Sequence, residues 1–145
     1  MVYLDTSALI KRYIPERHSD RFEDYFATRA ATLISRLTFI ELRSALARKR
    51  REHRLNVAQE QAALQEVRTD IQDGVIVVHS MSDADFVNAY HLMDEMPDIP
   101  LRSLDALHLA VARDRGATEL ATADDVMRRA GTQLGFAVAY FGDTH

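Results

Sequence analysis

The sequence contains no cysteine and no long apolar stretch. The absence of cysteine excludes disulfide bonds, thiolate zinc sites and cysteine nucleophiles. The longest stretch without a charged side chain, Ala130 to Gly142, is 13 residues long, whereas a helix needs about 20 residues to span a bilayer. The first residues, Met1 to Asp5, contain neither a basic segment nor a long apolar run, so we expect no signal peptide. These absences predict a cytoplasmic protein with no membrane segment.

The charge balance is slightly acidic, because 18 lysine and arginine residues stand against 22 aspartate and glutamate residues and give a formal net charge of −4. This balance argues against a protein that coats nucleic acid through bulk charge, but it leaves room for a local basic patch. Of the 145 residues, 47% are apolar. We therefore expect a single domain over residues 1–145 that buries about 68–70% of its extended surface.

Short β-prone segments alternate with helical ones along the chain. Five strands are expected, at Val2–Leu4, Thr32–Ser35, Val75–Val78, Glu119–Thr122 and Phe136–Phe141. Strands that are separated by helices are typically parallel and are covered on both faces. The predicted fold class is therefore α/β, a three-layer α/β/α sandwich around a central, mainly parallel sheet. In such sheets, chemistry takes place at the carboxyl ends of the strands.

Three local patterns make specific predictions. Residues 75–78 are all apolar and β-branched, which is typical of a strand covered on both faces. Gly131 is expected to end the short helix that starts at Asp124. The helix that follows Ser82 has one apolar side, formed by Phe86, Val87, Tyr90 and Met93.

Four carboxylates fall at or just beyond the expected carboxyl ends of strands, or early in a helix: Asp5, Glu41, Asp105 and Asp124. If the sheet is parallel, all four converge on one edge. Several anions at one place repel each other and need a counter-charge. A hard divalent cation such as Mg²⁺ or Mn²⁺ supplies it, because these ions prefer oxygen ligands. A metal held in this way can activate water and stabilise a phosphoryl transition state.

Each acid also has a simpler interpretation when it is taken alone. Asp5 and Asp124 can cap helices, and Glu41 can be a solvated helix residue. Asp105 lies among leucine and alanine, where burial of an acid is costly, although an acid in a first turn also suits the helix dipole. Only the combined pattern favours a metal site.

Four ordered segments carry a family resemblance. They are the start Tyr3-Leu4-Asp5-Thr6-Ser7-Ala8-Leu9-Ile10-Lys11-Arg12-Tyr13, Ser35 through Glu41-Leu42-Arg43 with Ala45-Leu46, Leu101-Arg102-Ser103-Leu104-Asp105-Ala106-Leu107-His108-Leu109-Ala110, and Leu120-Ala121-Thr122-Ala123-Asp124. Together they resemble a PIN-domain ribonuclease, of the kind found as the VapC-type toxin of bacterial type II toxin–antitoxin pairs. The order, the spacing and the total length fit, and the resemblance spans nearly the whole chain.

The resemblance implies a metal-dependent endoribonuclease that hydrolyses RNA phosphodiester bonds. By position, the four acids would form the catalytic pocket for Mg²⁺ or Mn²⁺, with Asp5 and Asp105 in direct contact with the metal and Glu41 and Asp124 acting partly through water. The supporting hydroxyl groups would be those of Thr6, Ser7 and Thr122. The implied partners are the RNA substrate, a small cognate antitoxin and a second copy of the chain in a homodimer.

Basic residues beside these motifs are candidates for RNA binding: Arg48, Arg51 and Arg102. A solvated helix end is an equally good reading of the basic run 48–54. Arg48 lies seven residues after Glu41, hence on nearly the same helix face and about 10 Å further along the axis. Arg50 points away, so we expect Arg48 to contribute more to RNA binding. Arg102 can pair with a phosphate or with a pocket acid.

Three other features have mainly structural interpretations. His108, one turn after Asp105, is expected to hydrogen-bond within the core and not to catalyse. Asp125 is a further candidate acid beside Asp124, but capping is the favoured role. The aromatic residues Phe22, Tyr25 and Phe26 are expected to pack in the core or in a dimer and not to stack on bases.

Three alternative functions remain open from the sequence. A PIN-like nuclease outside a toxin–antitoxin system would share the same acids. A haloacid-dehalogenase-like phosphatase also begins with an aspartate after a first strand, but it needs a second aspartate two positions later, where this chain has Ser7. A non-catalytic interaction module is disfavoured because all four acids are present.

Overall fold

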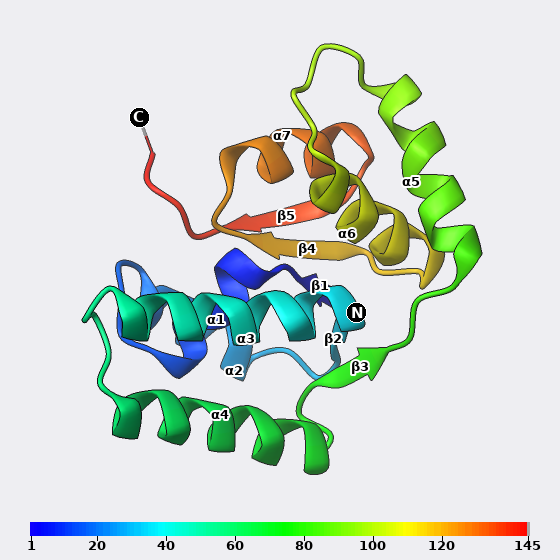
Figure 1. The fold of residues 1–145 in the computed structure, drawn as a ribbon. Helices are drawn as coiled ribbons and strands as arrows, with labels where there is room; N and C mark the ends of the chain where they lie inside the picture. The colour runs from blue at the N-terminus through cyan, green and yellow to red at the C-terminus, as the bar shows by residue number, and fades with distance from the viewer. Residues whose placement is uncertain (145) are drawn as a thin grey trace.

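The core of the fold is a five-stranded sheet in which every neighbouring pair of strands is parallel (Figure 1). The computed structural model describes residues 1–144. The strands lie in the order β3-β2-β1-β4-β5, and their bounds are β1 Val2–Leu4, β2 Thr32–Ser35, β3 Val77–His79, β4 Glu119–Thr122 and β5 Ala137–Tyr140. Seven helices cover the sheet within the described residues: α1 Thr6–Tyr13, α2 Ser19–Ala27, α3 Arg36–Arg51, α4 Val57–Gln72, α5 Asp83–Glu95, α6 Ser103–Asp114 and α7 Asp125–Gln133.

The two faces of the sheet bury separate cores. Alternate residues of a strand point to opposite faces, so Val2 and Leu4 of β1 join one core while Tyr3 joins the other. Side chains from α1 to α4 complete the first core, and side chains from α5 to α7 complete the second. The predicted three-layer α/β/α sandwich is therefore confirmed. No helix of residues 1–144 is long and apolar enough to cross a membrane.

The aromatic residues of α2 lie where the sequence suggests. Phe22 is fully buried and Phe26 nearly so, and Tyr25 packs against the same core. The ring of Phe141 packs against Phe22 and Tyr25, with centroid distances of 5.3 and 5.4 Å. Phe22 and Phe26 are therefore core residues, and Tyr25 packs on the edge of the same core.

The prediction that residues 75–78 form a strand covered on both faces is wrong. The strand after α4 is β3, which lies at the edge of the sheet; Val75 and Val77 are 39% and 49% exposed, and of the run 75–78 only Ile76 is fully buried. On the apolar side of α5, Phe86, Val87 and Tyr90 are exposed, and Met93 packs partly against the second core. The buried side of α5 instead carries Asp85, Ala89 and Leu92.

Gly131 does not end a helix, because α7 continues through it to Gln133. A Cβ atom at this position would lie 2.6 Å from Leu120 Cδ2 and 3.2 Å from Val138 Cγ2. The glycine therefore lets α7 approach β4 and β5 closely, and Gly135, whose φ is +92°, follows the end of the helix.

Candidate active site

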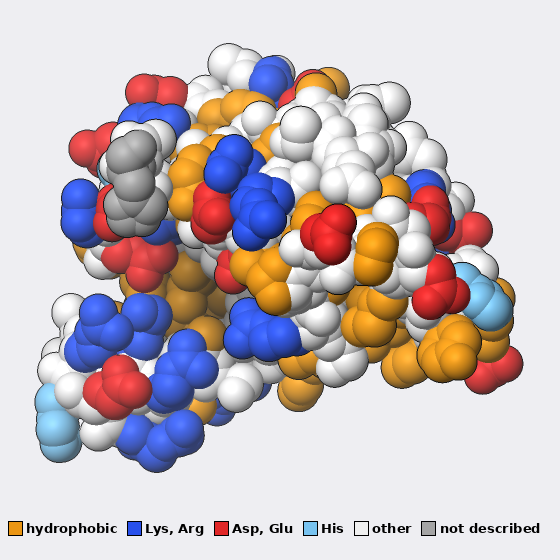
Figure 2. Space-filling view, turned by 90° about the horizontal axis from the view of Figure 1, so that it is seen from above, with side chains coloured by type: hydrophobic (Ala, Val, Ile, Leu, Met, Phe, Trp, Pro, Cys, Tyr) orange, Lys and Arg blue, Asp and Glu red, His pale blue; other side chains and the backbone are white. Residues whose placement is uncertain are grey.

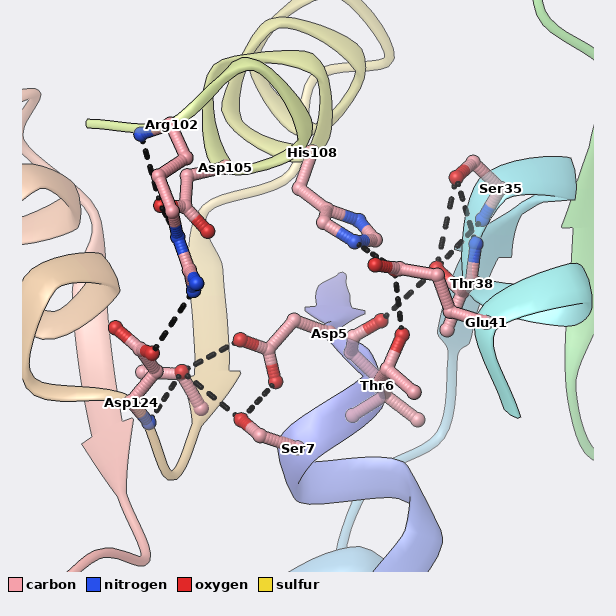
Figure 3. A network of polar contacts seen from close by, with 12 residues as sticks. Asp5, Thr6, Ser7, Ser35, Thr38, Glu41, Arg102, Asp105, His108 and Asp124 are labelled. Carbon is pink, nitrogen blue, oxygen red and sulfur yellow. Dashed lines mark hydrogen bonds and ion pairs between the residues drawn. The ribbon is translucent and has the colours of Figure 1, made fainter. Parts of the chain in front are cut away.

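A cleft opens where β1 and β4 end, and it is bounded by α1, α3, α6 and α7. We call this the acidic cleft. It has a volume of about 430 Å³ and is lined by Asp5, Thr6, Ser7, Ile10, Lys11, Glu16, Glu41, Ala45, Arg48, Lys49, Arg102, Asp105, His108, Ala123, Asp124 and Met127. The fold thus brings all four predicted acids to one site, from the ends of two central strands and the early turns of two helices (Figure 3).

Asp5 follows β1 directly and is the N-cap of α1. Its Oδ1 accepts hydrogen bonds from the Ala8 backbone N–H at 3.1 Å and from Ser7 Oγ at 2.7 Å, and its Oδ2 accepts one from Thr122 Oγ1 at 2.6 Å. The residue is only 4% exposed. Burial raises the pKa of the Asp5 carboxyl above its ordinary value, and these hydrogen bonds oppose the rise only in part. The sequence allowed a cap or a site residue here, and Asp5 both caps α1 and lines the acidic cleft.

Glu41 lies in the second turn of α3, opposite Asp5. Its Oε1 accepts a hydrogen bond from Thr6 Oγ1 at 2.8 Å and lies 2.5 Å from His108 Nε2. Burial raises the pKa of Glu41, but the hydrogen bonds from His108 and Thr6 outweigh it, and the net shift is downward. The expectation that His108 hydrogen-bonds within the core is confirmed, since Nδ1 lies 2.6 Å from the hydroxyl of Tyr3.

Asp105 and Asp124 lie on the other side of the cleft and share one cationic neighbour. The carboxylate of Asp105 accepts a hydrogen bond from the Arg102 backbone N–H at 3.1 Å and lies 3.5 Å from Arg102 Nε. Arg102 Nη2 lies 4.0 Å from Asp124 Oδ2 (Figure 3). Asp124 is also the N-cap of α7, through Met127 N at 2.9 Å. Arg102 therefore pairs with pocket acids, one of the two roles expected for it.

The acid beside Asp124 lies outside the cleft. Asp125 belongs to the first turn of α7, its side chain is 55% exposed, and it pairs with Arg128. The hydroxyl groups named from the sequence are all engaged with carboxylates: Ser7 and Thr122 with Asp5, and Thr6 with Glu41. Their immediate effect is to orient these two acids.

Asp5 differs from the other deeply buried acids in its neighbours. Glu60, Asp70 and Asp85 are 3%, 8% and 1% exposed, and each forms an ion pair with an arginine. These pairs are Glu60–Arg50, Asp70–Arg12 and Asp85–Arg115, with N–O distances of 2.8, 2.8 and 3.0 Å. Within residues 1–144, no lysine or arginine lies within ion-pair distance of Asp5. Its carboxylate instead accepts hydrogen bonds from hydroxyls and one backbone N–H, and the charge of His108 also favours its ionised form.

The chemistry of the donors fits a hard divalent cation. The acidic cleft offers carboxylate oxygens from four separate elements, and oxygen is the ligand that Mg²⁺ and Mn²⁺ prefer. As the side chains of residues 1–144 stand, no three acidic or histidine side chains are close enough to ligate one ion. Joint ligation by three of them therefore requires side-chain rotation, and Arg102, whose side chain is 78% exposed, has room to leave its two acids.

Basic residues surround the acidic cleft at the end of α3. The last turn of this helix carries Arg48, Lys49, Arg50 and Arg51, and Figure 2 shows lysine and arginine side chains gathered at the same end of the molecule, beside a hollow. Arg48 lines the cleft, whereas Arg50 pairs with Glu60. Arg51 is exposed and is not among the lining residues.

Two lining cations escaped the sequence reasoning. Lys11 of α1 is 8% exposed and donates to Glu16 Oε1 at 3.2 Å, and Lys49 Nζ lies 3.5 Å from the other oxygen of Glu16. A signal was available, because Lys11 lies four residues after Ser7 and Lys49 lies eight after Glu41, so both share a helix face with a site residue.

Comparisons with known proteins agree with this geometry. The family model of the PIN domain matches residues 2–133, and the chain therefore belongs to the PIN-domain family. Within it, the chain is similar to Ribonuclease VapC46 of Mycobacterium tuberculosis, with 32% identity over 139 residues that cover 94% of this chain and 95% of the relative. This match supports the nuclease reading over the phosphatase alternative.

Solved structures share the fold at lower identity. VapC20 of Mycobacterium tuberculosis, described as a sarcin-ricin loop cleaving toxin, superposes with a TM-score of 0.72 at 18% identity and covers 90% of this chain and 95% of its own. The DNA-bound VapBC from Salmonella typhimurium gives a TM-score of 0.65 at 17% identity, with 97% of each chain covered. At these identities, the likeness concerns the fold alone.

Proposed function

We propose that this chain is a metal-dependent endoribonuclease that acts in the cytoplasm as the toxin of a toxin–antitoxin pair. The observation that carries the proposal is Asp5, a buried carboxylate without a cationic partner in residues 1–144, in a cleft that three further acids line. A relative named as a VapC ribonuclease, matched over nearly the whole of both chains, supports the same function.

In this proposal the acidic cleft holds Mg²⁺ or Mn²⁺, with Asp5 and Asp105 as direct ligands and Glu41 and Asp124 contributing partly through water. Such an ion supplies an activated water and charge stabilisation at a phosphoryl centre. The hydroxyls of Ser7 and Thr122 hold the Asp5 carboxylate in a fixed orientation.

In this proposal, arginine side chains of the protein contact the phosphates of the RNA backbone. Arg48 lines the cleft on the same side of α3 as Glu41, and Arg102 lies at its opposite wall. Phosphate contacts from arginine position a nucleic acid without reading its sequence. Arg51 belongs to the same basic helix end but lies outside the cleft, so its contact would be with RNA that extends beyond the reacting phosphate.

The proposed partners are a cognate antitoxin and a second copy of the chain. A solved structure with the same fold, described as a toxin–antitoxin complex from Klebsiella pneumoniae, supports the antitoxin. The exposed apolar side chains Phe86, Val87 and Tyr90 on α5 support association, because large apolar patches on a soluble surface usually mark contact sites. Light scattering measures the oligomeric state of the purified chain, alone and with the product of any short reading frame found beside its gene. A monomer that ignores that product would instead favour a nuclease outside a toxin–antitoxin system.

The decisive experiment is RNA cleavage with Mg²⁺ or Mn²⁺, with and without EDTA, on structured and single-stranded RNA oligonucleotides. We expect cleavage by the wild type to stop on chelation, and the variant Asp105→Asn to be inactive. Asp125→Asn is the matched control, because this acid is exposed, pairs with Arg128 and lies outside the cleft. Cleavage that survives both EDTA and Asp105→Asn would overturn the proposal.

A further inference from the structure

A chain of buried side chains runs from the middle of the sheet to Glu41. The hydroxyl of Tyr3 on β1 lies 2.9 Å from Ser35 Oγ and 3.3 Å from Thr38 Oγ1. The same hydroxyl lies 2.6 Å from His108 Nδ1, and His108 Nε2 lies 2.5 Å from Glu41 Oε1. Figure 3 shows His108 reaching from α6 toward Glu41 on α3. Four elements, β1, β2, α3 and α6, are thus joined behind one carboxylate.

The donor and acceptor roles along this hydrogen-bond network follow from Glu41, where the network ends. An ionised carboxylate only accepts, so the Nε2 of His108 donates to Glu41. If the imidazole is neutral, the other nitrogen, Nδ1, is then an acceptor and takes the hydrogen of the Tyr3 hydroxyl. The Tyr3 oxygen in turn accepts from Ser35. The hydrogen atoms of Ser35, Tyr3 and His108 then all point along the network toward Glu41.

Packing alone does not require these polar groups. Tyr3, Ser35 and Thr38 are fully buried and His108 is 4% exposed, and polar groups are costly in such places unless they are hydrogen-bonded. A phenylalanine would fill the space of Tyr3 without needing a partner. The sequence places a hydroxyl there, and that hydroxyl forms a hydrogen bond with His108 Nδ1.

The effect at Glu41 is a fixed carboxylate with one oxygen left over. Both hydrogen bonds, from Thr6 and from His108, fall on Oε1. Within residues 1–144 the structure records no partner for Oε2, and the residue lines the acidic cleft. A held carboxylate with one free oxygen is prepared to accept a ligand without first losing rotamer freedom.

We propose that His108, backed by Tyr3, is a positioning residue that fixes the Glu41 carboxylate for a divalent cation in the acidic cleft. The proposal rests on the proposed function, since it takes the metal as given. His108 itself touches neither substrate nor metal in this scheme. Tyr3 fixes the ring of His108, and His108 fixes Glu41.

The test is Mn²⁺ binding by electron paramagnetic resonance, in the absence of RNA. Changing His108→Leu is expected to weaken binding by about 10- to 100-fold, as is typical when a group that orients a metal ligand is removed. Tyr3→Phe is expected to weaken it less. His108→Gln keeps an amide N–H near the Nε2 position and is expected to recover part of the affinity. If His108→Leu does not fold, the Mn²⁺ affinities of the Tyr3→Phe and His108→Gln variants still test whether His108 and Tyr3 position Glu41.

A double-mutant cycle with Glu41→Gln separates positioning from general stability. If His108 acts through Glu41, the double variant binds Mn²⁺ no more weakly than Glu41→Gln alone. Tyr13→Phe is the matched control, because the Tyr13 hydroxyl is also buried and donates to a carboxylate, Asp70 Oδ2 at 2.7 Å, outside the cleft. We expect it to lower the melting temperature without changing Mn²⁺ affinity.

Two results overturn the inference. The first is unchanged Mn²⁺ affinity in His108→Leu while Glu41→Gln weakens binding. The second is a loss from His108→Leu that persists in full in the Glu41→Gln background. Failure of the proposed function gives a different pattern, in which the wild type binds no Mn²⁺ or Asp5→Asn binds it as tightly as the wild type.

Discussion

Two groups of buried carboxylates are treated differently by the same fold. Asp70 and Asp85, far from the acidic cleft, each face a guanidinium group, and the pKa of each carboxyl is lowered. Asp5 is as deeply buried but faces hydroxyls and one backbone N–H, and its pKa is raised. Paired acids stabilise the fold, whereas Asp5 opposes it when ionised. A cation bound in the acidic cleft would offset this cost, as the proposed function requires.

The largest expected effect is at Asp5. Asp5→Asn should lower RNA cleavage by on the order of 10²–10³-fold or more, the usual result of removing a preorganised charge from a site. Because the pKa of Asp5 is raised in the folded state, its ionisation costs stability once the pH exceeds the unfolded value. The metal-free variant should therefore melt at a higher temperature, by about 2–4 °C. Cleavage kinetics and calorimetry at pH 7 measure the loss of activity and the rise in melting temperature. A lower melting temperature for Asp5→Asn would contradict the contrast between Asp5 and the paired acids.

Asp85→Asn should show the opposite pattern. The Asp85 carboxylate receives two hydrogen bonds from Arg115, both at 3.0 Å, and the substitution removes the buried one of the two carboxylates that pair with this guanidinium, the other being Asp114. We expect the free energy of unfolding in urea to fall by about 2–3 kcal/mol. Cleavage per folded molecule should remain that of the wild type. A loss of activity without a loss of stability would contradict the assignment of Asp85 to the fold.

The loss of folding stability at low pH should arise from the carboxylates that are paired with arginines. Their pKa is lowered on folding, so their contribution is present above the unfolded value of about 3.9 and is lost as the pH falls through the folded values. Urea midpoints measured from pH 7 down to pH 3 should therefore fall on the acid side. In Asp85→Asn this fall should be smaller, and an unchanged slope would count against the explanation.

The smallest expected effect separates two arginines on one helix turn. Arg48 lines the acidic cleft, while Arg50 is engaged with the buried Glu60 at 2.8 Å. Arg48→Ala should weaken binding of a single-stranded RNA and reduce the slope of log K against log salt by about 0.7. Arg50→Ala should lower stability and leave that slope unchanged. Fluorescence anisotropy at several salt concentrations measures both variants, and equal losses of RNA affinity would refute the distinction.

Much of the site was predictable because parallel strands end at one edge of a sheet. Asp5 follows β1 directly, Asp124 follows β4 after one residue, and Glu41 and Asp105 lie early in helices, so topology alone brings them together. The roles of Ser7 and Thr122 were less accessible. The hydrogen bond from Thr122 to Asp5 joins residues 117 positions apart, and the one from Ser7 depends on the rotamer of the cap residue Asp5, so neither follows from the local pattern.

The local pattern of apolar residues does not show which face of a segment is buried. In α5 the strongly apolar side is exposed, and a weaker side with Ala89 and Leu92 packs on α6. Asp85 belongs to that buried side because Arg115 reaches it from the end of α6, a contact that helical periodicity does not reveal. The apolar run 75–78 likewise reads as a central strand, but its place at the edge is set by the order of the strands.

The central position of β1 in the sheet also affects how often the backbone beside the site opens locally. This strand is hydrogen-bonded to β2 on one side and to β4 on the other, and its three residues are 0–1% exposed. The outer strands β3 and β5 are partly open to solvent. Local opening begins where few buried contacts hold the backbone, so amide hydrogen exchange should be fast at both rims and slow at β1. Asp5, which follows β1, then stays in place while the edge strands of the sheet open locally.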